Sequence, residues 1–137
     1  MTDNEEFRRT WRIKWLSSVQ EFADAESQRR LWLDPANTNL HSTFVEYLCC
    51  YFDDLGLSVG GYDWAVNKKL VTAPEVAAVS RFHQLAGSYE SPTEDYDHGP
   101  ILEDAKWAEV VEAAKRPQAD LFALLDHPHE RQFLMEL

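Results

Sequence analysis

The sequence has 137 residues, of which 45% are hydrophobic and 12% aromatic, a size and composition that suit one domain with its own core and argue against a disordered chain. Its net charge of −11 opposes binding to nucleic acid phosphates, and it contains no apolar run near the roughly 18 residues that span a bilayer. The acidic, polar start is unlike a secretory signal. We therefore expect a cytoplasmic protein that binds neither nucleic acid nor membrane.

The first expected helix covers residues 5–22, where apolar and aromatic residues recur at helical spacing. That face consists of Phe7, Trp11, Trp15, Val19 and Phe22. Thr2 and Glu5 have the spacing of a capping box. A second helical segment, residues 25–33, ends before Pro35, because proline disfavours a helical conformation of the residue that precedes it.

The next expected helix covers residues 42–55, with Gly56 as its C-cap. At about 100° per residue, six apolar residues share one face of this helix. They are Phe44, Val45, Leu48, Tyr51, Phe52 and Leu55. Asp53 and Asp54 fall in the last turn, where the helix dipole favours cations, so their placement costs a few tenths to about 1 kcal/mol. This cost suggests that the two carboxylates have another role, and chance placement is the alternative.

Residues 56–71 have the weakest pattern. Residues 56–62 are compatible with a short strand or hairpin and equally with a turn, and residues 63–70 with a short helix. Thr72-Ala73-Pro74-Glu75 predicts a helix start, because threonine, early proline and glutamate stand in the order of a capping box. That helix is expected to reach residue 86, with Val76, Val79, Phe82 and Leu85 on its inner face.

Residues 88–100 are the longest irregular stretch, and loops of this length often carry function. Asp104 then begins a helix that contains Trp107, and Pro117 ends that helix or opens the next. A last short helix covers residues 129–137. The whole pattern predicts an all-α fold in a single domain, residues 1–137, built as an irregular bundle of about five to seven helices.

No phosphate-binding loop, dinucleotide fingerprint, zinc-protease motif or nucleophile elbow occurs in the sequence, which favours a binding protein over an enzyme. His83 is interpreted as a buried, hydrogen-bonded residue, and His127 and His129 as surface or helix-cap residues. His98 suits a loop-closing contact or a recognition patch equally. Cys49-Cys50 is interpreted as two reduced thiols, one buried and one at the margin of its helix. We expect no metal and no cofactor.

The excess negative charge is concentrated in the middle of the chain. Residues 46–112 contain thirteen acids and four bases, a net −9, whereas residues 1–45 and 113–137 each have a net −1. In that middle region, carboxylates alternate with aromatic residues, as in protein interfaces that combine large anchors with a polar rim. A solvated acidic face is the alternative, and a calcium site lacks the required spacing. The predicted partner-binding residues are Asp53, Asp54, Asp63, Trp64, Glu94, Asp95, Tyr96 and Asp97.

Three segments resemble small acidic helical immunity proteins of bacterial polymorphic and contact-dependent toxin systems: Tyr47–Leu55, Phe82–Leu85 and Tyr89–Trp107. The resemblance is one of general sequence character over residues 40–115. It implies stoichiometric binding of a cognate toxin protein, often a basic nuclease, whose active site or substrate path is blocked; a monomer or weak dimer is expected. Two other classes stay open: a small enzyme with a carboxylate or His83-centred pocket, and an adaptor subunit of a larger assembly.

Overall fold

The computed structural model describes residues 3–34, 36, 43–93 and 98–135, and this part of the chain is helical with no strand. The all-α prediction is confirmed, and the eight α-helices described are close to the five to seven expected. In chain order the elements are α1 (Asp3–Ala23), α2 (Ala25–Trp32), α3 (Phe44–Leu48), the π-helix η1 (Cys49–Asp54), α4 (Leu57–Asn67), α5 (Ala73–Ser88), α6 (His98–Glu103), α7 (Ala105–Leu124) and α8 (Pro128–Met135).

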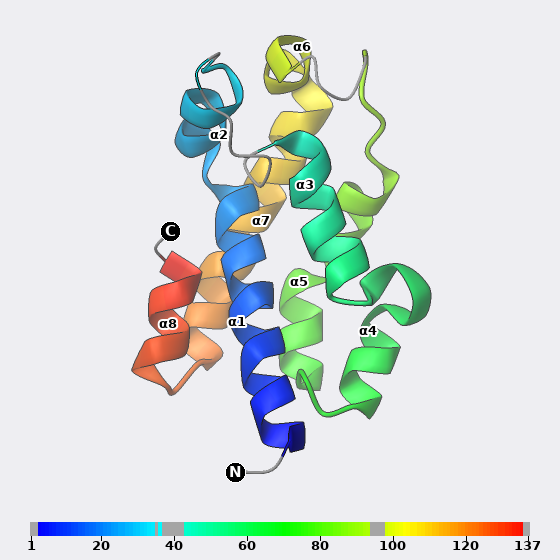
Figure 1. Cartoon of the computed structure of the whole chain (residues 1–137), viewed down its shortest axis with the longest axis vertical. Coiled ribbons are helices and arrows are strands. Elements are labelled where there is room, and N and C mark those ends of the chain that lie inside the picture. The colour runs from blue at the N-terminus through cyan, green and yellow to red at the C-terminus, as the bar shows by residue number, and fades with distance from the viewer. Residues whose placement is uncertain (1–2, 35, 37–42, 94–97, 136–137) are drawn as a thin grey trace.

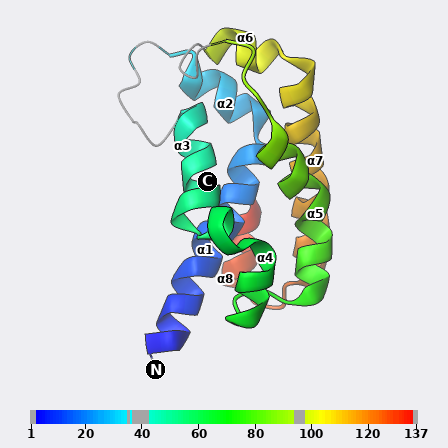
Figure 2. The ribbon, with the colours of Figure 1, turned by 90° about the vertical axis from the view of Figure 1, so that its right-hand side faces the viewer.

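Helix α1 runs along the long axis of the molecule (Figure 1). It packs mainly against α7 and α8, and α7 packs in turn against α5 (Figure 2). Helix α3 continues directly into η1, which packs on α1 and leads through a tight turn into α4. Helices α8 and α4 therefore lie on opposite sides of α1 in the view of Figure 1.

The core between these helices is rich in aromatic rings. Phe22 lies at its centre, with its ring centroid 5.1 Å from that of Phe82 and 5.9 Å from those of Tyr51 and Trp107. Tilted and edge-on ring pairs at such distances add to the stabilisation that burial provides. Trp11 is 4% exposed and Trp107 is 1% exposed, so both occupy the core as their places on apolar stripes predict.

Capping signals in the sequence correctly locate two helix starts. Thr72 Oγ1 accepts a hydrogen bond from the Glu75 backbone N–H, and Glu75 Oε1 accepts one from the Thr72 N–H, which completes the predicted capping box of α5. Asp104 caps α7 by accepting from the Lys106 N–H. The box predicted at Thr2 lies outside the described residues.

One alternative that the sequence left open is decided by the structure, and two local expectations differ from it. Residues 57–67 form α4 rather than the optional strand or hairpin, although Gly61 interrupts the helix with φ 58° and ψ −161°. Pro117 neither ends nor opens a helix; it lies buried inside α7. An interior proline costs roughly 3 kcal/mol, which the packing of α7 against α1 and α5 outweighs. The helix predicted over 42–55 is α-helical only to Leu48, and then widens into η1.

Candidate functional site

The N-terminal half of α1, the end of η1, the turn at Leu55 and Gly56, and Trp64 from the C-terminal half of α4 form a groove with a volume of about 200 Å³. We call it the acidic–aromatic groove. It is lined by Phe7, Thr10, Trp11, Lys14, Asp53, Asp54, Leu55, Gly56 and Trp64. Asp53, Asp54 and Trp64 belong to the surface predicted from sequence, whereas Phe7 and Trp11 come from α1, far away in the chain.

Two local features shape this groove. Trp11 Nε1 donates a 2.9 Å hydrogen bond to the Leu55 backbone oxygen, which attaches α1 to the end of η1. Gly56 then turns the chain into α4 with φ 74°, a left-handed conformation that glycine adopts without strain. A Cβ at Gly56 would lie 3.3 Å from the Trp64 ring, so the indole packs directly over the turn.

The aromatic walls of the groove are partly open to solvent. Phe7 is 54% exposed, although its place on the apolar stripe of α1 predicts a buried residue, and Trp64 is half-buried. Trp11 is buried and stacks on Trp15, with centroids 5.8 Å apart, so this ring anchors the groove to the core. An exposed phenyl ring beside a half-buried indole is the kind of anchor that protein interfaces use.

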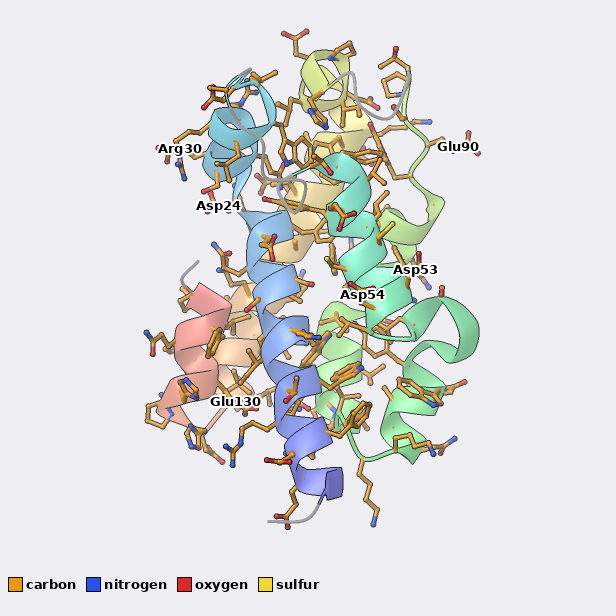
Figure 3. All side chains as sticks on the ribbon, in the orientation of Figure 1. Asp24, Arg30, Asp53, Asp54, Glu90 and Glu130 are labelled. Carbon is orange, nitrogen blue, oxygen red and sulfur yellow. The ribbon has the colours of Figure 1, made fainter. Side chains whose placement is uncertain are left out.

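Asp53 and Asp54 are exposed and are the last two residues of η1 (Figure 3). The unsatisfied carbonyls at a helix C-terminus carry a partial negative charge, so the two carboxylates add to a field of their own sign. Neither of them forms an ion pair within the described part of the chain, and Lys14, the cation that lines the groove, is exposed. The mouth of the groove is therefore negatively charged.

Cys49 and Cys50 begin η1, and both are free thiols, as predicted. Both are half-buried, so the prediction of one buried and one marginal thiol is wrong. Burial, and then the nearby carboxylates Asp53 and Asp54, raise the pKa of these thiols, that of Cys50 to about 11. At pH 7 both are protonated and therefore weak nucleophiles.

The remaining residues of the predicted surface do not line this groove. Asp63 is exposed on α4, next to Trp64, but it is not part of the lining. The predicted residues 94–97 lie outside the described residues. Sequence reasoning missed Phe7 because an apolar residue on a helical stripe is assigned to the core; the exposed position depends on where η1 and α4 leave α1 uncovered.

His83 belongs to a separate, internal chain of hydrogen bonds. Trp15 Nε1 donates to Tyr62 Oη at 2.9 Å, the Tyr62 and Tyr51 hydroxyl oxygens are 2.6 Å apart, and Tyr51 Oη lies 2.9 Å from His83 Nδ1. Since the indole can only donate, the chain is satisfied when Tyr62 donates to Tyr51 and Tyr51 donates to His83. Burial lowers the pKa of His83, which favours the neutral ring that this pattern requires.

His98 is a contact between helix ends. Its Nδ1 lies 3.1 Å from the Trp32 backbone oxygen, and its Nε2 accepts a hydrogen bond from the Phe44 N–H at 3.4 Å. The imidazole thus joins the C-terminus of α2 to the N-terminus of α3. Of the two roles open for His98, the structure shows the loop-closing one.

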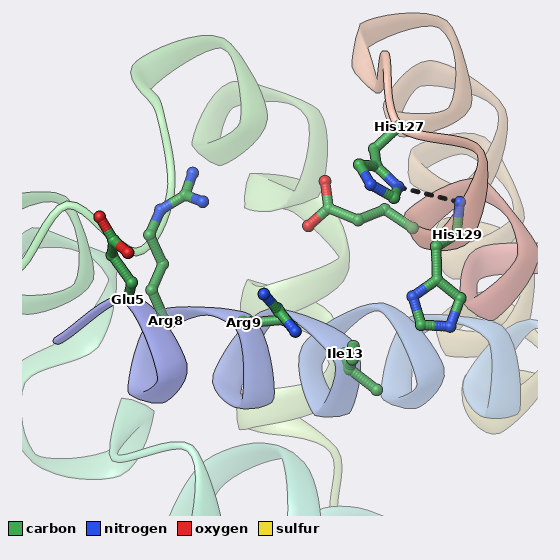
Figure 4. A pocket seen from close by; sticks show the side chains of 7 residues that line it. Glu5, Arg8, Arg9, Ile13, His127 and His129 are labelled. Atoms are coloured by element: carbon green, nitrogen blue, oxygen red, sulfur yellow. Dashed lines mark hydrogen bonds between the residues drawn. The ribbon is translucent and has the colours of Figure 1, made fainter. Parts of the chain in front are cut away.

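A second and larger groove, about 580 Å³, lies between α1 and α8 (Figure 4). We call it the mixed-charge groove. It is lined by Glu5, Arg8, Arg9, Ile13, His127, His129 and Glu130. Several of its polar groups stabilise the fold: Arg8 Nε donates to the Lys69 oxygen at 2.9 Å, and His127 Nδ1 accepts from the His129 N–H at 3.1 Å. Cations and carboxylates alternate here, so the lining has no dominant charge.

Comparisons with protein-family models, with curated proteins and with solved structures find no match to this chain. Within the residues described, no three or more His, Cys, Asp or Glu side chains are arranged to hold a metal ion. The described helices include none that is both long enough and apolar enough to cross a bilayer. Function must therefore be inferred from the shape and charge of the surface, where the acidic–aromatic groove is the strongest candidate.

Proposed function

We propose that this protein is an immunity-type inhibitor, which binds a cognate bacterial toxin domain through its acidic surface and blocks the toxin's active site. The observation that carries the proposal is the acidic–aromatic groove. There the exposed ring of Phe7 and the half-buried ring of Trp64 stand beside Asp53 and Asp54, two exposed carboxylates without an ion pair in the described residues. Aromatic anchors with a charged rim are typical of protein interfaces.

The charge of the whole molecule supports a basic partner, such as a nuclease domain. The net charge is −11, and residues 46–112, which include Asp53 and Asp54, have a net −9. Complementary fields speed the encounter of two proteins and disfavour partners of the wrong charge. A nuclease that binds phosphates presents a positive surface, so an acidic inhibitor is matched to the same surface that binds its substrate.

The dimensions of the groove favour a protein partner over a small-molecule substrate. Its volume of about 200 Å³ is below the roughly 300–1,000 Å³ of pockets that bind small molecules. The histidine proposed for an enzymatic pocket, His83, is occupied by its bond to Tyr51. These features support binding rather than catalysis at this groove, and they suit an inhibitor or an adaptor subunit equally.

Protection from toxicity distinguishes an inhibitor from an adaptor. The product of the neighbouring gene is expressed with and without this protein, and cell survival, copurification and association rates are measured. We expect toxicity without the protein, protection with it, a complex of one to one, and slower association as salt rises, because screening acts over about 8 Å at physiological ionic strength. A neighbouring product that is harmless, or that does not bind, contradicts the proposal.

A double variant locates the interface within the same assay. Asp53→Asn with Asp54→Asn is expected to slow association by about tenfold, because steering charges act mainly on the association rate. Glu103→Gln with Glu109→Gln removes the same charge from exposed positions that also form no ion pair in the described residues, and is the matched control. If both variants slow association equally, the carboxylates act only through net charge and the groove is not the interface.

A further inference from the structure

We infer that the acidic–aromatic groove binds a single arginine side chain that projects from the partner protein. This inference rests on the proposed function and specifies how the partner is recognised. The groove is small, about 200 Å³, and its lining comes from three segments that meet at the Gly56 turn. Such a volume admits one long side chain rather than a helix or a strand of the partner.

Three sources of negative potential meet in the groove. Asp53 and Asp54 are full charges at its rim. The C-terminal end of η1 contributes the partial negative charge of its carbonyl groups. The rings of Phe7 and Trp64 offer faces that attract cations, the indole more strongly than the phenyl ring. An occupant of this groove is therefore positively charged and in part apolar, as an arginine side chain is.

At two other places in the molecule, an aromatic ring is already contacted by an arginine of the same chain. The Arg131 guanidinium carbon lies 4.7 Å from the centroid of the Phe122 ring, and that of Arg12 lies 5.6 Å from the Trp15 ring. In the described ranges, no guanidinium or ammonium lies over Phe7 or Trp64. Lys14, the chain's own cation in the lining, is exposed and lies over neither ring. The groove thus combines the elements of an internal cation site, and an arginine over its rings has to come from another molecule.

The arrangement favours arginine over lysine. A guanidinium is planar, so it stacks on an aromatic face and still directs its fork of N–H donors toward carboxylates. Asp53 and Asp54 are neighbours in the chain and line the same groove as the aromatic walls. An ammonium is more strongly hydrated and offers no flat face, so it gains less from these walls.

A peptide probe tests this without the natural partner. Hexa-arginine, hexa-lysine and hexa-citrulline are titrated in low-salt buffer into the labelled full chain, and backbone amide and indole N–H shifts are followed by NMR. Hexa-arginine is expected to shift the signals of Phe7, Asp53, Asp54 and Trp64 first, hexa-lysine to bind more weakly, and neutral hexa-citrulline to leave them unchanged. Shifts spread evenly over the acidic positions of the chain overturn the inference, and so does equal binding of lysine and arginine.

Variants separate the aromatic contribution from the charge. Phe7→Leu is expected to weaken hexa-arginine binding by about threefold or more, and Trp64→Leu by more than Phe7→Leu. Because Phe7 is 54% exposed, its variant tests the groove even where Trp64→Leu disturbs folding. Phe122→Leu is the control, an exposed ring outside the groove. Equal effects of Phe7→Leu and Phe122→Leu overturn the inference.

The failure of this inference and the failure of the proposed function give different results. If the toxin binds and cells are protected, but Phe7→Leu and Trp64→Leu leave the affinity for the toxin unchanged, no arginine enters the groove and the inhibitor function stands. If hexa-arginine binds in the groove but the neighbouring gene product is neither toxic nor bound, the arginine site stands and the inhibitor function is wrong.

Discussion

The Arg12–Glu75–Glu130 cluster and the acidic–aromatic groove both adjoin α1, and each contains two carboxylates. In the cluster, Arg12 is 3% exposed, and its Nη2 lies 2.7 Å from Glu75 Oε2 while its Nε lies 2.7 Å from Glu130 Oε2. In the groove, Asp53 and Asp54 are exposed and have no ion pair in the described residues. Figure 3 shows Glu130 and the two aspartates on opposite sides of α1.

The difference between the two clusters separates charge that holds the fold from charge that is open to a partner. Burial alone would lower the pKa of Arg12, but its hydrogen bonds and attraction to Glu75 and Glu130 raise it. Burial alone would raise the pKa of Glu75, but Arg12 and the Thr72 cap hold it below its usual value. Each buried ion is stabilised by the other, and the cluster joins α1, α5 and α8.

The largest expected effect is at Arg12. Arg12→Met leaves Glu75 buried without its cation, and removal of one partner of a buried pair typically costs about 3–5 kcal/mol. We expect the free energy of unfolding, measured with urea, to fall by that amount. Lys14→Met removes an exposed cation from the same helix and should change it by no more than about 0.5 kcal/mol. A loss below about 1 kcal/mol for Arg12→Met would show that the cluster does not hold the helices together.

Gly56→Ala tests whether the turn shapes the groove. Its φ of 74° is unfavourable for alanine, and the added Cβ would lie 3.3 Å from the Trp64 ring. We expect the free energy of unfolding to fall by about 1–2 kcal/mol, and hexa-arginine binding to weaken as the indole moves. Gly99→Ala is the control, because a Cβ there meets nothing within 4 Å. Unchanged stability and binding in Gly56→Ala would mean that the turn adapts.

The burial of Glu21 is intermediate between that of Glu75 and that of Asp53, and this partial burial raises its pKa to about 7. The folded state then binds a proton more tightly than the unfolded chain between about pH 4.5 and 7, so stability falls as pH rises through this range. Allowing for solvent screening, Glu21→Gln should raise the free energy of unfolding by about 1 kcal/mol at pH 8 and leave it unchanged at pH 4.5. Glu6→Gln, at an exposed glutamate of α1, is the control variant. A Glu21→Gln variant as stable as the parent at pH 8 would contradict this expectation.

The smallest expected effect on stability is at the groove itself. Asp53→Asn with Asp54→Asn should change the free energy of unfolding by less than about 0.5 kcal/mol, or raise it slightly, because exposed carboxylates at a helix C-terminus oppose its dipole. Thermal unfolding followed by circular dichroism measures this. A loss above about 1 kcal/mol would show that these aspartates stabilise the fold, like Glu75, and the contrast between the two clusters would disappear.

Local signals account for the parts of the fold that the sequence predicts. The Thr72–Glu75 capping box depends on residues that are three positions apart, and the burial of Trp11 and Trp107 follows from helical periodicity. Both are decided within one or two turns of chain. The π-helix η1 and the continuation of α7 through Pro117 are not, because packing against other helices overrides the local preference there.

The amino-acid sequence by itself determined that this protein is helical, acidic and most negative in residues 46–112, because composition and periodicity need no knowledge of packing. Only the tertiary structure decided which carboxylates are neutralised: Glu75 and Glu130 reach Arg12 across helix interfaces, and Asp53 and Asp54 reach no cation within the described chain. It also decided that Phe7 lines the same groove as Asp53 and Asp54, because the bond from Trp11 to Leu55 attaches α1 to the end of η1. Contacts between segments so far apart depend on how the helices pack, which no local pattern specifies.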